Sequence, residues 1–387
     1  MHRFLIAVVF LFCASSLAAA QTESPVTTQT APPAAYSESK PYQPREFAAP
    51  KNSKPKKEKK SKKNEQAENK TPIADNPTGD VPPKIVDETI TIPVSVFDAG
   101  GRFVSNLRQA DFKIFADGEE QEITSVTRRD EPVNLILLVD TSPSTEYNIE
   151  EIQNYAQAII GQLKPGDKVM GIAFNQELKA LTELTADRQV TAKALRKLKF
   201  GNGTALYEAV KNTFGKYVSQ ISGLKTVVLL TDGVDTTSLR AGYADSLTAA
   251  EQSDAAVFPI YFDTSVINKK ATKNSGFFPP NINIAGNAAV LTAAEYELGR
   301  FYLNDIARLS GGRPQQVKDI SDVRPENIGN IGAELRAQYQ ISFRPKNFTI
   351  GQRKQITVRV NRPNLFVQAR GSLIAGAENK VEPAKQK

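Results

Sequence analysis

Five oxygen-bearing side chains stand where predicted strands and turns end. Asp140, Ser142 and Ser144 form an Asp-x-Ser-x-Ser run directly after a continuous apolar stretch. Thr204 follows a Gly-rich turn, and Asp232 comes shortly after a second apolar stretch. Carboxylates and hydroxyls are hard ligands that suit a small cation with octahedral geometry. Asp and Ser are common in ordinary turns, so the prediction of a divalent-cation site depends on all five residues together.

The composition excludes several other kinds of chemistry. The chain has one His and one Cys, and both lie close to its N-terminus, as His2 and Cys13. Beyond that segment there is no Ser-His-Asp or Cys-His nucleophile, no disulfide and no zinc site of the usual His/Cys kind. Any metal must be bound by oxygen. Three hydroxyls and two carboxylates favour Mg²⁺ or Mn²⁺ over Ca²⁺.

The elements that position these side chains alternate between strands and helices. In such an arrangement the strands form a mainly parallel, doubly wound α/β sheet with helices on both faces. Ligands then bind beyond the carboxyl ends of the strands. Apolar runs predict strands at 133–139, 169–174, 178–184 (a short antiparallel edge), 226–230 and 256–262. Helical spacing of apolar residues predicts helices at 150–163, 190–198, 205–217, 241–252, 298–309 and 327–337.

The order of the five side chains resembles the von Willebrand factor A and integrin inserted-domain family. The metal-ion-dependent adhesion site of that family uses Asp-x-Ser-x-Ser, then Thr, then Asp, and the resemblance covers roughly residues 134–310. It implies that Ser142, Ser144 and Thr204 supply hydroxyl ligands. It also implies that Asp140 and Asp232 supply negative charge, partly through bound water. One coordination position would stay open for an acidic residue of a partner.

Residues beside the five ligands are expected to contact that partner. We expect the rim of the site to contain Thr141, Tyr147, Gly203 and Asp235. The Asn- and Pro-rich segment 264–294 follows the last core strand as a long loop. It is either a second partner contact or an insertion without a binding role.

Both flanks of the α/β region, residues 84–130 and 338–376, are rich in short strands. Each flank is too small to bury a sizeable core alone. We therefore expect the flanks to pair into a small β-sandwich in which the α/β domain, residues 131–337, is inserted. The flanks are also similar to those of secreted bacterial von Willebrand A-related proteins, a group whose function is poorly defined. The predicted strands are 89–97, 112–115, 121–126, 338–343, 354–360 and 365–374.

The N-terminal residues have the pattern of a secretory signal peptide. Residues 1–20 combine a positive start, an apolar run and small residues before Gln21, and an uncleaved anchor is the alternative. Residues 21–80 and 377–387 are expected to be disordered, because they contain few large apolar side chains.

The linker contains a run of eight lysines and one glutamate between Lys51 and Lys63, in a chain of net charge +7. This run is either a solvated tether or a weak attachment to anionic envelope polymers or lipid headgroups. It holds no aromatic residue on which bases would stack, which argues against nucleic acid as a partner.

These patterns predict a secreted, periplasmic or extracellular protein that is not an enzyme. It would bind a protein or peptide ligand through a Glu or Asp of that ligand at the divalent cation. One alternative is a structural or assembly module of the cell envelope in which the metal only stabilises loops. Another is a metal-assisted hydrolase with Asp140 or Asp232 as base, for which the sequence supplies no further acid.

Overall fold

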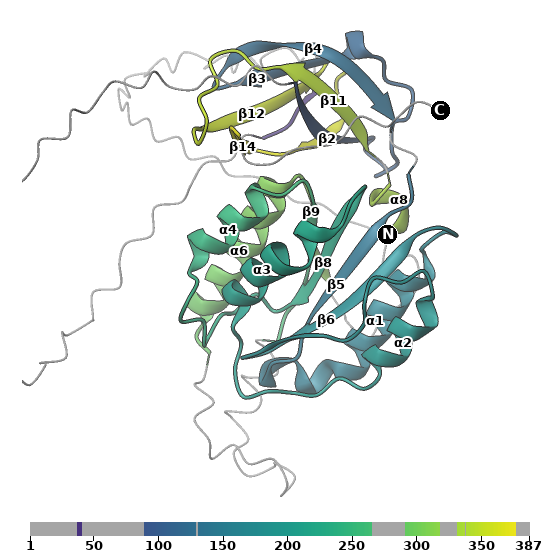
Figure 1. Cartoon of the computed structure of the whole chain (residues 1–387), viewed down its shortest axis with the longest axis vertical. Helices are drawn as coiled ribbons and strands as arrows, with labels where there is room; N and C mark the ends of the chain where they lie inside the picture. Colours follow the sequence, from purple (N-terminus) through teal and green to yellow (C-terminus); the bar gives the residue numbers. More distant parts are fainter. Residues whose placement is uncertain are drawn as a thin grey trace, which may run out of the picture. The chain divides into compact units, whose positions relative to one another are not determined.

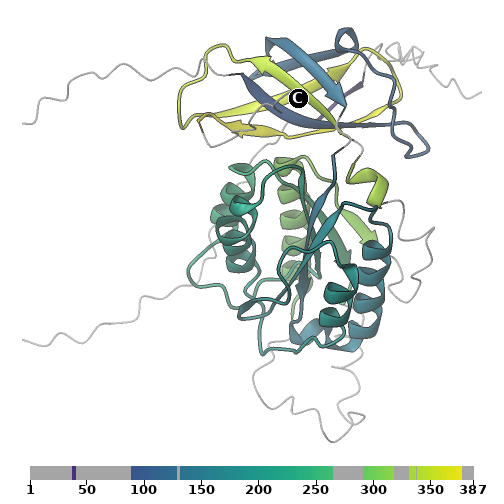
Figure 2. The same ribbon diagram turned by 45° about the vertical axis from the view of Figure 1, so that its right-hand side comes forward.

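The computed structural model describes residues 37–40, 89–128, 131–264, 291–317, 331–336 and 338–376. All of them belong to the compact unit that extends from residue 35 to residue 387. They form a parallel α/β domain and an antiparallel β domain built from chain segments on both sides of it (Figures 1 and 2). The fold class predicted from the sequence is therefore confirmed.

The α/β domain is built on a six-stranded sheet with the order β10-β9-β8-β5-β6-β7. Its strands pair in parallel except at β7, which runs antiparallel to β6 as predicted for the edge. β5 pairs with β8 and β6 at its two edges, and its two faces pack against helices, so its sequence is an unbroken apolar run. The strands are β5 (Asn134–Asp140), β6 (Lys168–Phe174), β7 (Leu178–Ala180), β8 (Lys225–Thr231), β9 (Ala256–Phe262) and β10 (Gln315–Val317).

Helices cover both faces of this sheet (Figure 1). Ile136 and Leu138 of β5 join the hydrophobic core that contains α3, α4 and α6, whereas Leu135, Leu137 and Val139 join the core that contains α1. This division follows from the alternation of side chains along a strand. The α-helices are α1 (Ile149–Gly161), α2 (Arg188–Leu195), α3 (Leu206–Lys216), α4 (Tyr243–Glu251), α6 (Ala293–Ser310) and α8 (Ile331–Glu334). Short 3-10 helices are η1 (Gln109–Asp111), η2 (Pro143–Asn148) and η3 (Val218–Gln220).

The β domain is an eight-stranded antiparallel sheet with the order β1-β12-β3-β4-β11-β2-β13, in which β14 pairs with β12. Strands from the two flanks are interleaved in this sheet, and β11 lies between β4 and β2. Ile92 and Ile114 from one flank share a hydrophobic core with Ile341 and Val358 from the other. The predicted pairing of the flanks is therefore confirmed. The strands are β1 (Ser37–Glu38), β2 (Ile90–Phe97), β3 (Phe112–Ala116), β4 (Glu119–Arg128), β11 (Tyr339–Arg344), β12 (Arg353–Val360), β13 (Phe366–Ala369) and β14 (Ser372–Ile374).

The prediction of a single strand over residues 365–374 is wrong. β13 pairs with β2, whereas β14 pairs with β12, and the chain changes partner at Arg370 and Gly371. The side chain of Arg370 is buried and points to the carbonyl of Leu309 in the α/β domain. This inward turn ends the pairing with β2, and a pattern of alternating residues does not reveal it.

The prediction of disorder throughout residues 21–80 is also wrong at residues 37–40. Ser37 and Glu38 form β1, an edge strand against β12. The amide of Ser39 donates to the carbonyl of Val358 at 2.7 Å. An edge strand offers unpaired backbone groups to any extended segment, so a polar segment pairs there without a hydrophobic signal of its own.

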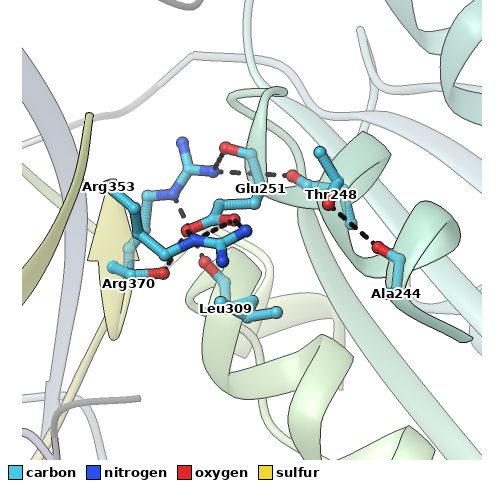
Figure 3. A network of polar contacts seen from close by, with 8 residues as sticks. Ala244, Thr248, Glu251, Leu309, Arg353 and Arg370 are labelled. Carbon is cyan, nitrogen blue, oxygen red and sulfur yellow. Dashed lines mark hydrogen bonds and ion pairs between the residues drawn. The ribbon is translucent and has the colours of Figure 1, made fainter. Parts of the chain in front are cut away.

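A buried network of polar groups joins α4 to the β domain (Figure 3). The Glu251 carboxylate, at the end of α4, accepts two hydrogen bonds from Nε of Arg353, both 2.9 Å, and one from its Nη2 at 2.6 Å. Ser372 Oγ donates to the same carboxylate. The guanidinium of Arg370, 1% exposed, donates to the Glu251 carbonyl. Burial lowers the pKa of Arg370, and the charge of Glu251 opposes this effect.

Several predictions concern residues that the structure does not describe. The signal peptide at residues 1–20, the Lys51–Lys63 run and the tail at 377–387 lie outside the described residues, as does most of the segment 264–294. Of the helix predicted at 327–337, only α8 is described. Among the described residues, no helix has both the length and the apolar character needed to cross a membrane.

Candidate metal centre

The ends of the two central strands bring the acidic residues together. Val139 of β5 is paired in register with Leu230 of β8, so the next residues along both strands, Asp140 and Thr231, are neighbours. Thr231 Oγ1 donates to Asp140 Oδ2 at 2.5 Å. Asp232 follows directly, and both carboxylates have an exposed fraction of 0%. The parallel pairing of two buried strands therefore places both acids at the carboxyl edge of the sheet, as predicted.

Two serines connect the acids. The Ser142 amide donates to Asp140 Oδ1 at 2.9 Å, which closes the turn after β5. The hydroxyls of Ser142 and Ser144 are 3.1 Å apart, and Ser144 Oγ donates to Asp232 Oδ2 at 2.7 Å. Four of the five predicted ligands thus form one connected cluster of oxygen atoms.

Thr204, the fifth predicted ligand, is held by the loop that follows β8. Its carbonyl accepts from the amides of Thr236 and Thr237 at 2.8 and 3.0 Å, and its own amide donates to Thr236 Oγ1 at 2.9 Å. The preceding turn fits tightly: a Cβ on Gly203 would lie 2.5 Å from Cγ2 of Thr237, and one on Gly201 would lie 2.4 Å from Cγ of Asn175. The Gly-rich turn therefore allows Thr204 to approach both neighbouring loops.

Three residues that the sequence did not single out complete the cluster. Thr231 bonds to Asp140, as described above. Thr264, two residues beyond the end of β9, donates from Oγ1 to Asp232 Oδ2 at 2.8 Å, and its hydroxyl is 2.9 Å from that of Tyr296 on α6. Thr231 and Thr264 could have been found from the sequence, because each is a Thr at or near the end of a predicted strand. No local pattern signals Tyr296, because it reaches the site only through the packing of α6.

The electrostatics of the cluster are unfavourable for two bare carboxylates. Burial, and then the charge of Asp232, raise the pKa of Asp140 to about 7. Burial also raises the pKa of Asp232. Within the described part of the chain, neither acid forms an ion pair with a Lys or Arg. Both ionised carboxylates therefore lack a counter-charge, which a divalent cation would supply.

The oxygen donors fit such a cation. The side chain of Thr204 is 4% exposed, and its hydroxyl makes no hydrogen bond to any residue that the structure describes. No cluster of three or more His, Cys, Asp or Glu side chains exists among the described residues. The donors are therefore two carboxylates and several neutral hydroxyls, a hard set suited to Mg²⁺ or Mn²⁺.

The predicted rim is corrected in part. Thr141 is fully buried, with Oγ1 bonded to the Phe174 carbonyl at 3.0 Å, and Gly203 is buried too, so neither forms an exposed rim. Asp235 is partly buried and accepts from the amide of Tyr207 at 3.0 Å and from the Ser238 hydroxyl at 2.6 Å. Its carboxylate holds the loop to the first turn of α3. The side chain of Tyr147 is not among those described.

Comparisons with known proteins identify the α/β domain. Residues 134–276 match the family model of the von Willebrand factor type A domain. No curated protein matches the chain. Similar solved structures include a von Willebrand factor type A protein from Catenulispora acidiphila, which is 16% identical with a TM-score of 0.40, over 70% of this chain and 75% of that one.

Two further structures are similar at the same level. BatB from Bacteroides thetaiotaomicron is 17% identical with a TM-score of 0.39, over 53% of this chain and 97% of that one. Proximal thread matrix protein 1 from the mussel byssus, solved with a zinc-occupied MIDAS motif, is 12% identical with a TM-score of 0.39, over 57% and 49%. At these scores, the ligands of those proteins say nothing about this chain. The match to the family model, on the sheet and helices described above, shows that residues 134–276 form a von Willebrand factor type A domain.

Proposed function

We propose that this protein is a divalent-cation-dependent binding module of the adhesion type. Asp140, Ser142, Ser144, Thr204 and Asp232 hold Mg²⁺ or Mn²⁺, with Ca²⁺ the less suitable ion. The cation accepts a Glu or Asp carboxylate of a protein or peptide partner. The observation that carries this proposal is the pair of fully buried carboxylates that have hydroxyl partners and no counter-charge among the described residues.

The donor chemistry explains why an acidic partner is favoured. The hydroxyls of Ser142, Ser144 and Thr204 are neutral, so they leave the charge of the cation intact. Ser144 and Thr264 both donate to Asp232 at 2.7–2.8 Å, which spreads the charge of that carboxylate over hydrogen bonds. A bound cation then attracts a further anionic oxygen. Domains of this family typically serve as interaction modules rather than enzymes, and we propose the same role here.

One observation favours a second candidate, a structural or assembly module of the cell envelope. The hydrogen bonds from Thr231 to Asp140 and from Ser144 to Asp232 already join the loops after β5 and β8. A cation that only reinforces these bonds would stabilise the loops and leave no position for a partner. The two candidates differ in whether the bound cation exchanges a ligand with an external carboxylate.

Cation binding is tested by thermal unfolding of the full chain in Mg²⁺, Mn²⁺, Zn²⁺ or chelator. A cation at one hundred times its dissociation constant stabilises the folded state by about 2.7 kcal/mol. We expect this increase in the wild type and its loss in Asp140→Asn. Asp187→Asn is the matched control, because Asp187 caps α2 away from the cluster and Asn also caps helices well. If no cation raises the unfolding temperature of the wild type, the proposal fails.

Partner binding is tested with Mn²⁺ as the bound ion. The magnetic relaxation rate of water protons reports how many water molecules are bound to the Mn²⁺ ion. N-acetyl-glutamate amide is then added as a model of the partner's acidic side chain. We expect it to displace water from the bound Mn²⁺, whereas the uncharged N-acetyl-glutamine amide does not. Tight Mn²⁺ binding with no response to the glutamate probe would support the structural candidate instead.

We also propose export and a role for the Lys51–Lys63 run, both suggested by the sequence alone. Export with cleavage before Gln21 predicts that mass spectrometry of the native protein finds Gln21 at its N-terminus. Weak attachment through the lysine run predicts retention on an anionic polymer such as dextran sulfate. Retention should fall when lysines of the run are changed to glutamine and when salt is raised.

A further inference from the structure

Leu239 is exposed to an unusual degree for a large apolar side chain. Its exposed fraction is 93%, against 65% for Phe366, 48% for Ile350 and 47% for Val190 among the described residues. It lies in the loop between β8 and α4, seven residues after Asp232. A single exposed Leu on a protein surface needs no explanation. Leu239 differs from an ordinary exposed Leu because its backbone is held in a fixed position.

That backbone is fixed by two acidic side chains. Glu208 Oε1 accepts from the amides of Leu239 and Arg240, both at 2.6 Å. These two bonds lower the pKa of Glu208, so the carboxylate holding the loop is ionised at neutral pH. Asp235 accepts from the amide of Ser238 at 3.2 Å and from its hydroxyl at 2.6 Å. The loop is therefore pinned to the first turns of α3 while its apolar side chain faces solvent.

The same loop contacts the candidate metal centre. The amide of Thr237 donates to the carbonyl of Thr204 at 3.0 Å, and its methyl group packs against Gly203. Leu239 follows two residues later, so its Cα lies within about 7.6 Å of the Cα of Thr237. An extended segment advances about 3.3 Å per residue, so a few residues of a bound peptide are enough to cover a distance of this order beside the site.

We propose that Leu239 is an apolar contact for the segment whose acidic residue binds the cation, an inference that rests on the proposed function. The ligand is an extended peptide segment with a Glu or Asp and, one to four positions away, a Leu-like side chain. Binding covers the exposed surface of Leu239 without first ordering the loop, because Glu208 and Asp235 already hold it. A binding surface that is already ordered costs less conformational entropy on binding than a loop that must first be ordered.

The test uses the full chain in Mg²⁺ and acetylated peptides that contain one Glu and one Leu, either adjacent or separated by one to three glycines. Matched peptides carry Ala in place of Leu, and affinities are measured by calorimetry. At the best spacing we expect the Leu peptide to bind the wild type about tenfold more tightly than the Ala peptide, from partial burial of two leucine side chains. Leu239→Ala should abolish this preference, and Ile350→Ala, an exposed residue of the β domain, should keep it.

Glu208→Ala is the second variant, because it removes the acceptor of the two loop amides and keeps the Leu239 side chain in the sequence. We expect it to reduce the preference for Leu while Mg²⁺-dependent stabilisation is unchanged. If every peptide fails to bind in Mg²⁺, the proposed function fails. If Glu peptides bind in Mg²⁺ but not in chelator, and Leu239→Ala leaves the preference for Leu intact or none exists, this inference alone is overturned.

Discussion

The network around Glu251 allows a stability change to be worked out from the structure. Replacement of Glu251 by Ala removes the acceptor for Arg353 and Ser372 and the counter-charge near Arg370. The side chain of Glu251 has an exposed fraction of 0%, so water does not replace it. The guanidinium of Arg370 then stays buried with only carbonyl partners. Removal of one partner from a buried ion pair costs about 3–5 kcal/mol.

The exposure of Arg353 reduces that figure. Its side chain is 43% exposed, so it regains water when the carboxylate is lost. We therefore expect Glu251→Ala to lower the free energy of unfolding by about 3 kcal/mol, near the bottom of the range for buried pairs. Arg353→Met alone should cost about 1–2 kcal/mol, because Arg370 still neutralises Glu251. In the Glu251→Ala background the same Arg353 change should cost almost nothing, which a double-mutant cycle detects.

Urea denaturation followed by circular dichroism is the assay, because a denaturant that is itself a salt would screen the ion pair. The matched control is Glu122→Ala, which removes a 3.1 Å ion pair with Arg344 whose two side chains are 59% and 63% exposed. A pair of that kind contributes at most about 1 kcal/mol. If Glu251→Ala costs no more than Glu122→Ala, water reaches the network and the argument from burial is refuted.

Three further predictions concern the site and the core, and the second of them has a matched glycine control. In chelator, the free energy of unfolding should fall as the pH rises from 4 to 7, by at most about 4 kcal/mol. The reason is that the pKa of Asp140 is about 7 in the folded chain, whereas the same carboxyl in the unfolded chain loses its proton near pH 3.8. Urea denaturation across this range should show a flatter profile for Asp140→Asn. Gly299→Ala should cost about 1–3 kcal/mol in the same assay, because the new Cβ would lie 2.6 Å from the carbonyl oxygen of Gly233. Gly215→Ala, in α3 with open space around it, should instead stabilise by up to about 1 kcal/mol. Asp167→Ala should lower the free energy of unfolding by about 3 kcal/mol, since it leaves two backbone amides and a partly buried arginine without their acceptor. Thermal unfolding measures this loss, and a much smaller loss would contradict the prediction.

The acids of the site were predictable because a simple rule places them. Two apolar runs that alternate with helices become parallel strands, and the residues after them meet at one edge of the sheet. Asp140 and Asp232 obey this rule, because the register of β5 against β8 places Asp140 beside Thr231, the residue directly before Asp232. For the β domain, the sequence predicted only that strands of the two flanks pair with each other. Its strand order comes from pairing between strands far apart in the sequence, and the change of partner occurs where Arg370 bonds to the α/β domain. No period in the sequence encodes either feature.

The rim of the site shows why residue type alone misleads about exposure. Thr141 and Gly203 adjoin ligands and are predicted at the rim, yet the structure buries Thr141 against the end of β6 and Gly203 against Thr237. Leu239 has the residue type of a core side chain, and a sequence argument assigns such a residue to the interior. Its side chain is 93% exposed, and its backbone is held by Glu208, thirty-one positions earlier in the chain. The apolar contact that we propose for the partner therefore depends on hydrogen bonds between distant residues, which only the folded chain reveals.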